Sequence, residues 1–445
     1  MERRIISRPG NAAATQRREV AGIIDGEGQY CARVAAGGPL VFFGTTAVDA
    51  GGELTGDALV EPPYHLSPAA HAVHQGHAIF RELAAGLEAV GSGLEHILQV
   101  EQFTPAKAYA DGYITTRGGY LAQARPTTAL AATGPLLPED AVVCTTGTAV
   151  RPGAGIEKEI TELPKGEEGG GIDWSQLGQD YAGSPPYNDV VVAGPYVFVT
   201  GDVTLDPATG EVDPAARVPD FIWAGSEARN EADVLLARLG ERMEQVGGSL
   251  DDVVHVTLMV TDITDIFEID RAWKRAFGDA PPARTLIPVR GLGVPRREGT
   301  GMGHRDDAVK MEQQVRGLIP GRGADREVIT TGTGRLAHEA EAVRAGELMW
   351  MSHQYARAAA GTGAEHEVDE IFARLDELTT AAGGGLAGIV QLRVFVTDLA
   401  AGRAVHAKVR ECFDGDPPVV TVTTVPGPLL IPGAELFVDA VALAG

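Results

Sequence analysis

Apolar residues recur with one helical spacing at three places in the chain. Each set follows the steps i, i+1, i+4, i+8 and i+11, which place its members on one face of an amphipathic helix. The pattern therefore predicts three helices, each buried along one face. The sets are Ile79, Phe80, Leu83, Leu87 and Val90; Leu235, Leu236, Leu239, Met243 and Val246; and, weaker toward its end, Ile371, Phe372, Leu375, Thr379 and Ala382.

The sequence around each of these helices repeats as well. Each helix is followed by a glycine-rich stop and then by alternating residues typical of a strand. A second helical segment leads to a proline in the equivalent place of every copy. The chain is thus predicted to contain three copies of one unit, ordered hairpin, helix, strand, helix and final strands. The stops are Gly91-Ser92-Gly93, Gly247-Gly248-Ser249 and Gly383-Gly384-Gly385, the strands are LQVEQFT, VHVTLMVTD and VQLRVFVTD, and the prolines are Pro126, Pro282 and Pro418.

A chain of 445 residues is too long for one ordinary core. We predict repeats at about 1–155, 184–318 and 335–445, joined by linkers at 156–183 and 319–334. Each sheet of such an α+β unit needs a partner surface for its apolar face. We therefore expect closed packing as an intramolecular pseudo-trimer. An open string of units is the alternative, and it is disfavoured because the copies are longer than the usual solenoid repeats.

Composition and charge restrict the possible partners. The formal net charge of −24 disfavours nucleic acid and anionic membrane surfaces, because both require basic partners. No segment is long and apolar enough to cross a bilayer. We expect a cytoplasmic protein, because its cysteines are few and lack metal or redox spacing. We also expect no metal and no cofactor. The three cysteines are Cys31, Cys144 and Cys412.

Three histidines, His71, His74 and His77, recur along a predicted helix start. Their spacing drifts around the helix, and no acidic residue or cysteine accompanies them. A polar helix face is therefore favoured over a metal site.

One arginine has an unusual local context. Arg284 follows the pair Pro281-Pro282, which fixes the backbone there. Its planar guanidinium suits a carboxylate, so Arg284 is the first candidate for a substrate clamp. A salt bridge at a surface or an interface is the alternative interpretation.

Four stretches in the second repeat resemble a known family. They are PYVFVTGDVTLDPATGEV, GGSLDDVVHVTLMVTD, DIFEIDRAWKRAF and PPART, and they resemble the RidA family of reactive-intermediate deaminases, which has the YjgF-type fold. The resemblance is strong over the second repeat and eroded over the first and third. Members of this family are typically homotrimers with active sites in clefts between subunits. The resemblance thus implies a chorismate-mutase-like α+β fold and a trimer fused into one chain.

The resemblance also implies roles for individual residues. Arg284 would hold a substrate carboxylate, and Glu312 on the last strand would be the second catalytic residue, with Lys310 as its other possible register. An insertion, GLGVPRREGTGMGHRDD, could form a lid over the site, or it could be a solvated surface loop. The implied substrate-binding residues are Tyr187, Thr200, Gly201, Asp270, Thr285 and, from the insertion, His304.

The corresponding positions of the other repeats have diverged, so we expect one functional cleft per chain. The arginine becomes Thr128 and Val420, and the glutamate becomes Cys144 and Phe437. The pair Thr200-Gly201 corresponds to Phe43-Gly44 and Ser352-His353, the tyrosine to Tyr30 and Glu339, and Asp270 to His406.

The activity that the resemblance implies is hydrolysis of a small enamine or imine bearing a carboxylate. Arg284 would bind the carboxylate, Glu312 would activate water, and a 2-oxo acid and ammonia would be released. One alternative is a related enzyme retuned to cyclisation, condensation or dehydration in a specialised pathway, using Asp270, His304 and His406. The other is a non-catalytic ligand-binding or scaffold protein. We expect a monomer or a dimer, with a small imine, enamine or 2-oxo acid as its partner.

Overall fold

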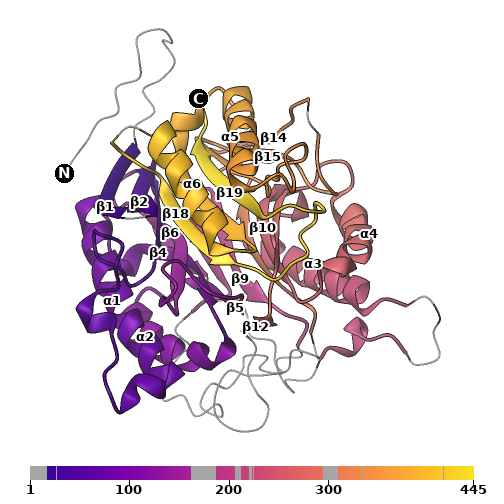
Figure 1. Cartoon of the computed structure of the whole chain (residues 1–445). Helices are drawn as coiled ribbons and strands as arrows, with labels where there is room; N and C mark the ends of the chain where they lie inside the picture. The colour runs from indigo at the N-terminus through magenta and orange to yellow at the C-terminus, as the bar shows by residue number, and fades with distance from the viewer. Residues whose placement is uncertain are drawn as a thin grey trace.

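The computed structural model is a mixed α+β structure with strands at its centre and helices around the outside (Figure 1). It describes residues 18–26, 28–161, 187–205, 212–219, 223, 225–293, 309–332, 334–413 and 415–445. Among these residues, no helix combines the length and the apolar character needed to span a membrane.

Three consecutive segments of the chain contain the same succession of elements. Segment 1 comprises β1 (Arg18–Gly26), β2 (Gln29–Gly37), β3 (Leu40–Thr45), α1 (Pro68–Ala89), β4 (Ile97–Thr104), α2 (Ala110–Leu121), β5 (Thr127–Ala132) and β6 (Cys144–Val150). Segment 2 comprises β7 (Lys158–Thr161), β8 (Val190–Ala193), β9 (Tyr196–Asp202), α3 (Glu227–Gln245), β10 (Val253–Val260), α4 (Ile266–Phe277), β11 (Ala283–Pro288), β12 (Gly291–Leu292) and β13 (Met311–Leu318). Segment 3 comprises β14 (Arg326–Ile329), β15 (Ala342–Ala345), β16 (Leu348–Met351), α5 (Ala364–Ala381), β17 (Ile389–Val396), α6 (Leu399–Cys412), β18 (Val419–Thr424) and β19 (Leu436–Leu443).

The six main strands of each segment pair in one order. That order is β5-β4-β6-β3-β2-β1 in segment 1, β11-β10-β13-β9-β8-β7 in segment 2 and β18-β17-β19-β16-β15-β14 in segment 3. In each case the strand after the second helix is parallel to the strand before it, as expected for a helical crossover. The short strand β12 leaves segment 2 and pairs with β5 of segment 1.

The segments contact one another in a ring. At each junction the carbonyl of the proline before one segment's edge strand accepts a backbone N–H from the next segment. Asn188 donates to Pro126 at 3.2 Å, Ala340 donates to Pro282 at 2.9 Å, and Ala32 donates to Pro418 at 3.0 Å. We call these contacts the first junction (segments 1 and 2), the second (segments 2 and 3) and the third (segments 3 and 1).

Apolar burial follows the three sequence stripes. Their residues lie in three separate cores, each between the sheet of one segment and its own helices. Two further apolar clusters, each with residues from all three segments, fill the space between the sheets. The other face of each sheet is therefore covered by the neighbouring segments, as closed packing requires.

Both stretches expected to be linkers contain a strand. β7 pairs with β8, and β14 pairs with β15, in each case antiparallel. Each of these strands is short, which leaves little periodicity to read from the sequence.

Candidate active site

Arg284 lies on β11 at the second junction and is fully buried. Its Nη2 is 2.8 Å from Oε2 of Glu339 in segment 3 and 2.8 Å from Oδ1 of Asp270 on α4. Its guanidinium also stacks over the Trp273 ring, 4.6 Å from the centroid. Burial opposes the charge, but the two carboxylates outweigh it and raise the pKa of Arg284.

Glu339 is therefore the carboxylate that Arg284 holds. Burial alone would raise the pKa of this carboxyl group, but Arg284, followed by His353, lowers it to about 2. Ser352 and His353 close the rest of the junction: Arg284 N–H donates to Ser352 Oγ at 2.8 Å, and Leu286 N–H donates to His353 Nδ1 at 3.0 Å. The sequence signal for this arrangement was an acidic residue, Glu339, replacing a tyrosine opposite the only retained arginine.

Glu312 lies at a different place, the first junction. A Cβ on Gly201 would lie 2.1 Å from Glu312 Oε1, so only glycine allows this approach. Burial, then the charges of Asp202 and Glu101, raise the pKa of Glu312 to about 8, although backbone groups of Gly293 and Leu130 hydrogen-bond its carboxylate form.

Glu312 rather than Lys310 is the inward residue, because Lys310 precedes β13. Lys310 points to α3 and α4, where its N–H donates to Glu231 at 2.8 Å and its Nζ donates to Asp265 at 3.1 Å. Glu312 is two residues further along and buried.

Thr200 and Tyr187 also belong to the first junction region. Thr128 N–H donates to Thr200 Oγ1 at 3.1 Å, and this hydroxyl donates to the Thr128 carbonyl at 3.0 Å. Thr128 stands where a second clamp arginine would be, so Thr200 anchors the neighbouring strand instead. Tyr187 is half-buried and lies near Arg242 of α3.

The expectation that Arg284 and Glu312 share one site is therefore wrong. Both flank β10, where Arg284 pairs opposite Val256 and Glu312 opposite Met259. These two positions are three residues apart, so their side chains point to opposite faces of the sheet. Arg284 faces α4 and segment 3, whereas Glu312 faces segment 1.

Two other expected site residues lie elsewhere. Thr285 donates to Asp439 at 2.5 Å and contacts His255 at 3.0 Å, so it belongs to a polar cluster at the centre of the molecule. His304 falls outside the residues that the structure describes.

The third junction has neither the arginine nor the glutamate. Val420 and Cys144 line a small cavity of about 20 Å³ there, together with His406. Burial raises the pKa of Cys144 to about 12 and lowers that of His406 to about 4. Counted from the hairpin turns, Gly44 rather than Phe43 occupies the place of Thr200, so the sequence alignment of this pair was off by one residue.

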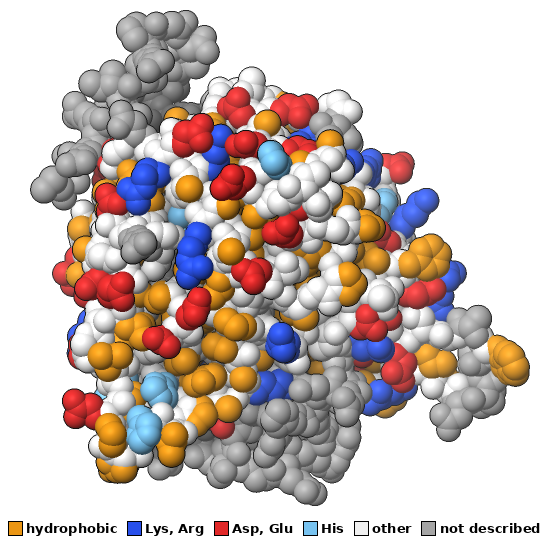
Figure 2. Space-filling model, in the orientation of Figure 1, with side chains coloured by type: hydrophobic (Ala, Val, Ile, Leu, Met, Phe, Trp, Pro, Cys, Tyr) orange, Lys and Arg blue, Asp and Glu red, His pale blue; other side chains and the backbone are white. Residues whose placement is uncertain are grey.

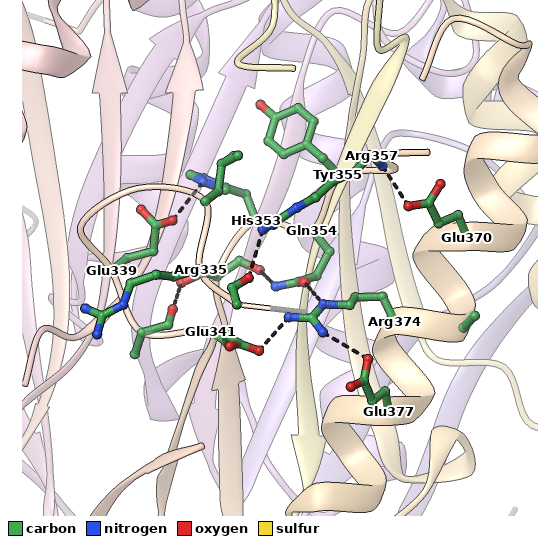
Figure 3. A pocket seen from close by; sticks show the side chains of 15 residues that line it. Arg335, Glu339, Glu341, His353, Gln354, Tyr355, Arg357, Glu370, Arg374 and Glu377 are labelled. Atoms are coloured by element: carbon green, nitrogen blue, oxygen red, sulfur yellow. Dashed lines mark hydrogen bonds and ion pairs between the residues drawn. The ribbon is translucent and has the colours of Figure 1, made fainter. Parts of the chain in front are cut away.

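A cavity of about 210 Å³ borders the second junction within segment 3 (Figure 3). Glu339, Glu341, His353, Gln354 and Arg374 are among its lining residues. Sequence reasoning missed this cavity, because its walls come from three separate stretches of segment 3, at 334–341, 352–357 and 370–377.

No group of three or more His, Cys, Asp or Glu residues within the described part of the chain could hold a metal ion. The histidines of α1 instead contact other groups: His71 meets the His65 carbonyl at 2.8 Å, and His77 meets the Tyr120 hydroxyl at 3.2 Å.

Comparison with known proteins places similarity mainly on the second segment. A family model described as "Endoribonuclease L-PSP" matches residues 179–297. The RutC family protein y4sK of Sinorhizobium fredii is 30% identical over 107 residues, which cover 24% of this chain and 76% of that protein. The 2-iminobutanoate/2-iminopropanoate deaminase of Capra hircus is 27% identical over 107 residues, covering 24% of this chain and 70% of that protein. A chorismatase crystal structure aligns over 78% of this chain and 93% of its own with 11% identity and a TM-score of 0.45.

Proposed function

Because the chain belongs to the RutC family, also called the RidA or YjgF-type family, we propose that it hydrolyses a small imine or enamine at the first junction. Relatives of the chain include 2-iminobutanoate/2-iminopropanoate deaminases. The family model is described as an endoribonuclease, but a net charge of −24 opposes binding to a polyanion. On the face in view, Figure 2 shows acidic and basic side chains interspersed, without a broad basic surface.

The observation that carries this proposal is the buried carboxyl of Glu312. With a pKa of about 8, this group is mostly protonated at neutral pH and can give up its proton without a large energetic cost. A group of this kind can act first as an acid and then as a base, since its pKa lies near the working pH. Because residue 201 is glycine, the Glu312 carboxyl group lies against backbone there and not against a side chain.

The proposed reaction begins with protonation of the imine nitrogen by Glu312. Water then attacks the imine carbon, and the Glu312 carboxylate takes the proton that this water releases. Glu312 next protonates the amino group of the carbinolamine, the C–N bond breaks, and the hydroxyl proton returns to Glu312. The products are a carbonyl compound and ammonia, and the carboxyl group ends in its starting state.

The proposal differs from the sequence-based scheme in substrate binding. Arg284 is held by Glu339 and Asp270 at another junction, so it does not clamp the substrate. At the first junction, Thr128 replaces the arginine that would bind a carboxylate. This replacement favours an imine whose recognition does not depend on a carboxylate.

We further propose that the three segments are divergent copies arranged as the single-chain counterpart of a trimer. The shared strand order and the three proline junctions support this proposal. Because only the first junction keeps the glutamate, the chain would have one active site.

An imine assay tests the proposed activity. An imine without a carboxylate is generated in situ, and its decay and the release of ammonia are followed against buffer. We expect the wild type to accelerate the decay and Glu312→Gln to lose about 100-fold or more in kcat, the contribution typical of a general acid-base group. Lys310→Gln is the matched control, because Lys310 is close in sequence but points away from the junction.

Two outcomes would contradict the proposal. If the wild type adds nothing to the spontaneous rate, the chain is not an imine hydrolase for this substrate class. If Glu312→Gln retains the wild-type rate while Lys310→Gln loses it, the proton-transfer group has been assigned to the wrong residue.

A further inference from the structure

The 210 Å³ cavity of segment 3 is separate from the proposed hydrolase site. It lies between α5, the end of β16 and the stretch that leads into β15, and neither Glu312 nor Gly201 lines it. Its volume equals that of about seven molecules of liquid water. A small metabolite fits in a space of this size.

Two buried carboxylates form one side of the cavity. Glu339 and Glu341 are 1% and 5% exposed, respectively. They are two residues apart in the chain, and both line the cavity. Each has one guanidinium beside it, Arg284 for Glu339 and Arg374 for Glu341, the latter at 2.5 Å. One ammonium group placed between the carboxylates could hydrogen-bond to both.

A buried ring nitrogen of His353 that makes no hydrogen bond within the described part of the chain also lines the cavity, within ion-pair distance of Glu339. His353 accepts the Leu286 N–H at Nδ1, which places the proton of the neutral ring on Nε2. Nε2 is buried and makes no hydrogen bond with the described residues, and the nearest carboxylate oxygen, Oε1 of Glu339, is 3.7 Å away. Buried donors are nearly always satisfied in native proteins, so this atom indicates a missing acceptor.

A basic group stands on the opposite side of the opening from α5. Arg335 is exposed, and within the described part of the chain no carboxylate pairs with it. Figure 3 shows Arg335 on the side of Glu339, across the cavity from Arg374 and Glu377 on α5. The cavity therefore combines a site for a cation with a donor and a basic group for an anion.

We propose that this cavity binds a zwitterionic α-amino acid. The ammonium group lies between Glu339 and Glu341, and the carboxylate lies toward Arg335, with His353 Nε2–H as a further donor. A ligand with only a carboxylate would bring a further negative charge beside Glu339 and Glu341, whose own charges Arg284 and Arg374 already balance. A ligand with only an amine would leave Arg335 and His353 unused.

Titration calorimetry on the full chain tests this proposal with L-2-aminobutanoate, L-serine and L-glutamine as probes. Propylamine and 2-oxobutanoate are the matched analogues of L-2-aminobutanoate, each lacking one charged group. We expect at least one amino acid to bind one per chain. We also expect L-2-aminobutanoate, where it binds, to bind at least tenfold more tightly than either analogue. Repeating the titration with Glu312→Gln should give the same affinity, because the hydrolase site is not involved.

Three variants locate the binding site. Ala373→Phe fills the cavity opening from α5 and should abolish binding, because Ala373 lines the cavity. Arg335→Gln should weaken amino-acid binding at least fivefold and leave propylamine unaffected. Lys274→Gln removes one exposed positive charge from α4, outside the cavity, and should change neither affinity.

The proposal is overturned if none of the three amino acids binds, or if 2-oxobutanoate binds as tightly as L-2-aminobutanoate. Equal binding by propylamine also overturns it, since recognition would then involve the ammonium alone. Unchanged affinity in Ala373→Phe would place the bound amino acid elsewhere. Glu341→Gln serves as a second check: it should lose amino-acid binding, and a thermal melt of the same sample shows whether the variant is folded.

Discussion

At the scale of single residues, Arg284 binds the carboxylate of Glu339, whereas the family resemblance led us to expect that it binds the carboxylate of a substrate. The Arg284 clamp was predicted from sequence because a Pro-Pro pair and a family-like segment surround it. Glu339 could not be predicted as its partner, because the two residues are 55 positions apart and meet only across the second junction. Sequence alone also could not show that Glu312 faces another segment.

Removal of Glu339 should expose a small carboxylate-binding site. Glu339→Ala leaves the buried guanidinium of Arg284 with Asp270 alone, so we expect a loss of about 2 kcal/mol in the free energy of unfolding. Acetate should recover part of this loss by binding the folded state, and chloride at the same ionic strength should not. Urea melts of Glu339→Ala measure both effects. In Arg284→Met/Glu339→Ala, an acetate effect of equal size would contradict the assignment.

Glu312 should make stability fall as pH rises. Its pKa is about 8 in the folded chain against an ordinary value of 4.5, so the folded state holds a proton that the unfolded state has released. The stabilisation is complete below pH 4.5 and lost above pH 8. At pH 9, Glu312→Gln should exceed the wild type by on the order of 4 kcal/mol in free energy of unfolding. Chemical denaturation at pH 5 and 9 measures this, and equal differences at both pH values would contradict it.

At the scale of elements, each first helix is tied to the start of the last strand by one side chain. Gln75 on α1 accepts Val142 N–H at 2.7 Å, and Glu231 on α3 accepts Lys310 N–H at 2.8 Å. In segment 3, Glu367 on α5 accepts the N–H of Glu435 at 2.9 Å. In each segment the tied N–H lies two residues before the glutamate position, which is Cys144, Glu312 or Phe437. The contact therefore fixes the register of that position.

The tie in segment 2 should be sensitive to pH. Burial raises the pKa of Glu231 to about 7, so its neutral form is favoured in the folded chain and stability falls from about pH 4.5 to pH 7. Glu231→Gln copies the side chain that segment 1 already uses and should remove on the order of 3 kcal/mol of this pH-dependent change. Melts across pH 5 to 9 measure the slope. A slope identical to that of the wild type would show that Glu231 does not titrate in this range.

The helices were the most predictable elements. The stripes beginning at Ile79, Leu235 and Ile371 are buried as predicted, because a period of 3.6 over three turns is a strong signal. The strands β1, β7, β12 and β14 were not predicted. Each adds to a sheet edge through backbone hydrogen bonds, which place few constraints on side chains. Three of them are four residues or shorter, and the longer β1 carries mixed burial.

At the scale of the whole molecule, the three segments meet in a buried ionic cluster. Glu101 on β4 accepts from Thr257 Oγ1 on β10 at 2.9 Å and from Arg316 at 2.7 Å, and Arg393 on β17 also donates to it. Arg393 in turn binds Asp439. Alternation predicted the strands that carry these residues, but the charge pairing depends on how separate strands converge, which the sequence does not encode locally.

Loss of Glu101 should therefore weaken contacts among all three segments at once. Glu101→Gln leaves Arg316 and Arg393 short of one negative charge in a dry interior, and we expect a loss of about 3–5 kcal/mol in the free energy of unfolding. Replacement of Arg316 by Met in the same chain should recover part of it, because Arg316 pairs with Glu101 and its uncompensated charge is then removed. Denaturant melts of the three proteins test this. Equal stability of Glu101→Gln and the wild type would show that the cluster contributes little.

The residues of this cluster also limit how the chain can change. Glu101, Thr257 and Arg393 each lie opposite the third residue of the following parallel strand, so they hold the same position in their segments. A ring built from one segment alone would bring three like charges, or three uncharged hydroxyls, to this point, and only the mixed set neutralises itself. On its own, segment 1 or segment 3 would therefore assemble in this way only after its charged residue at this point was replaced.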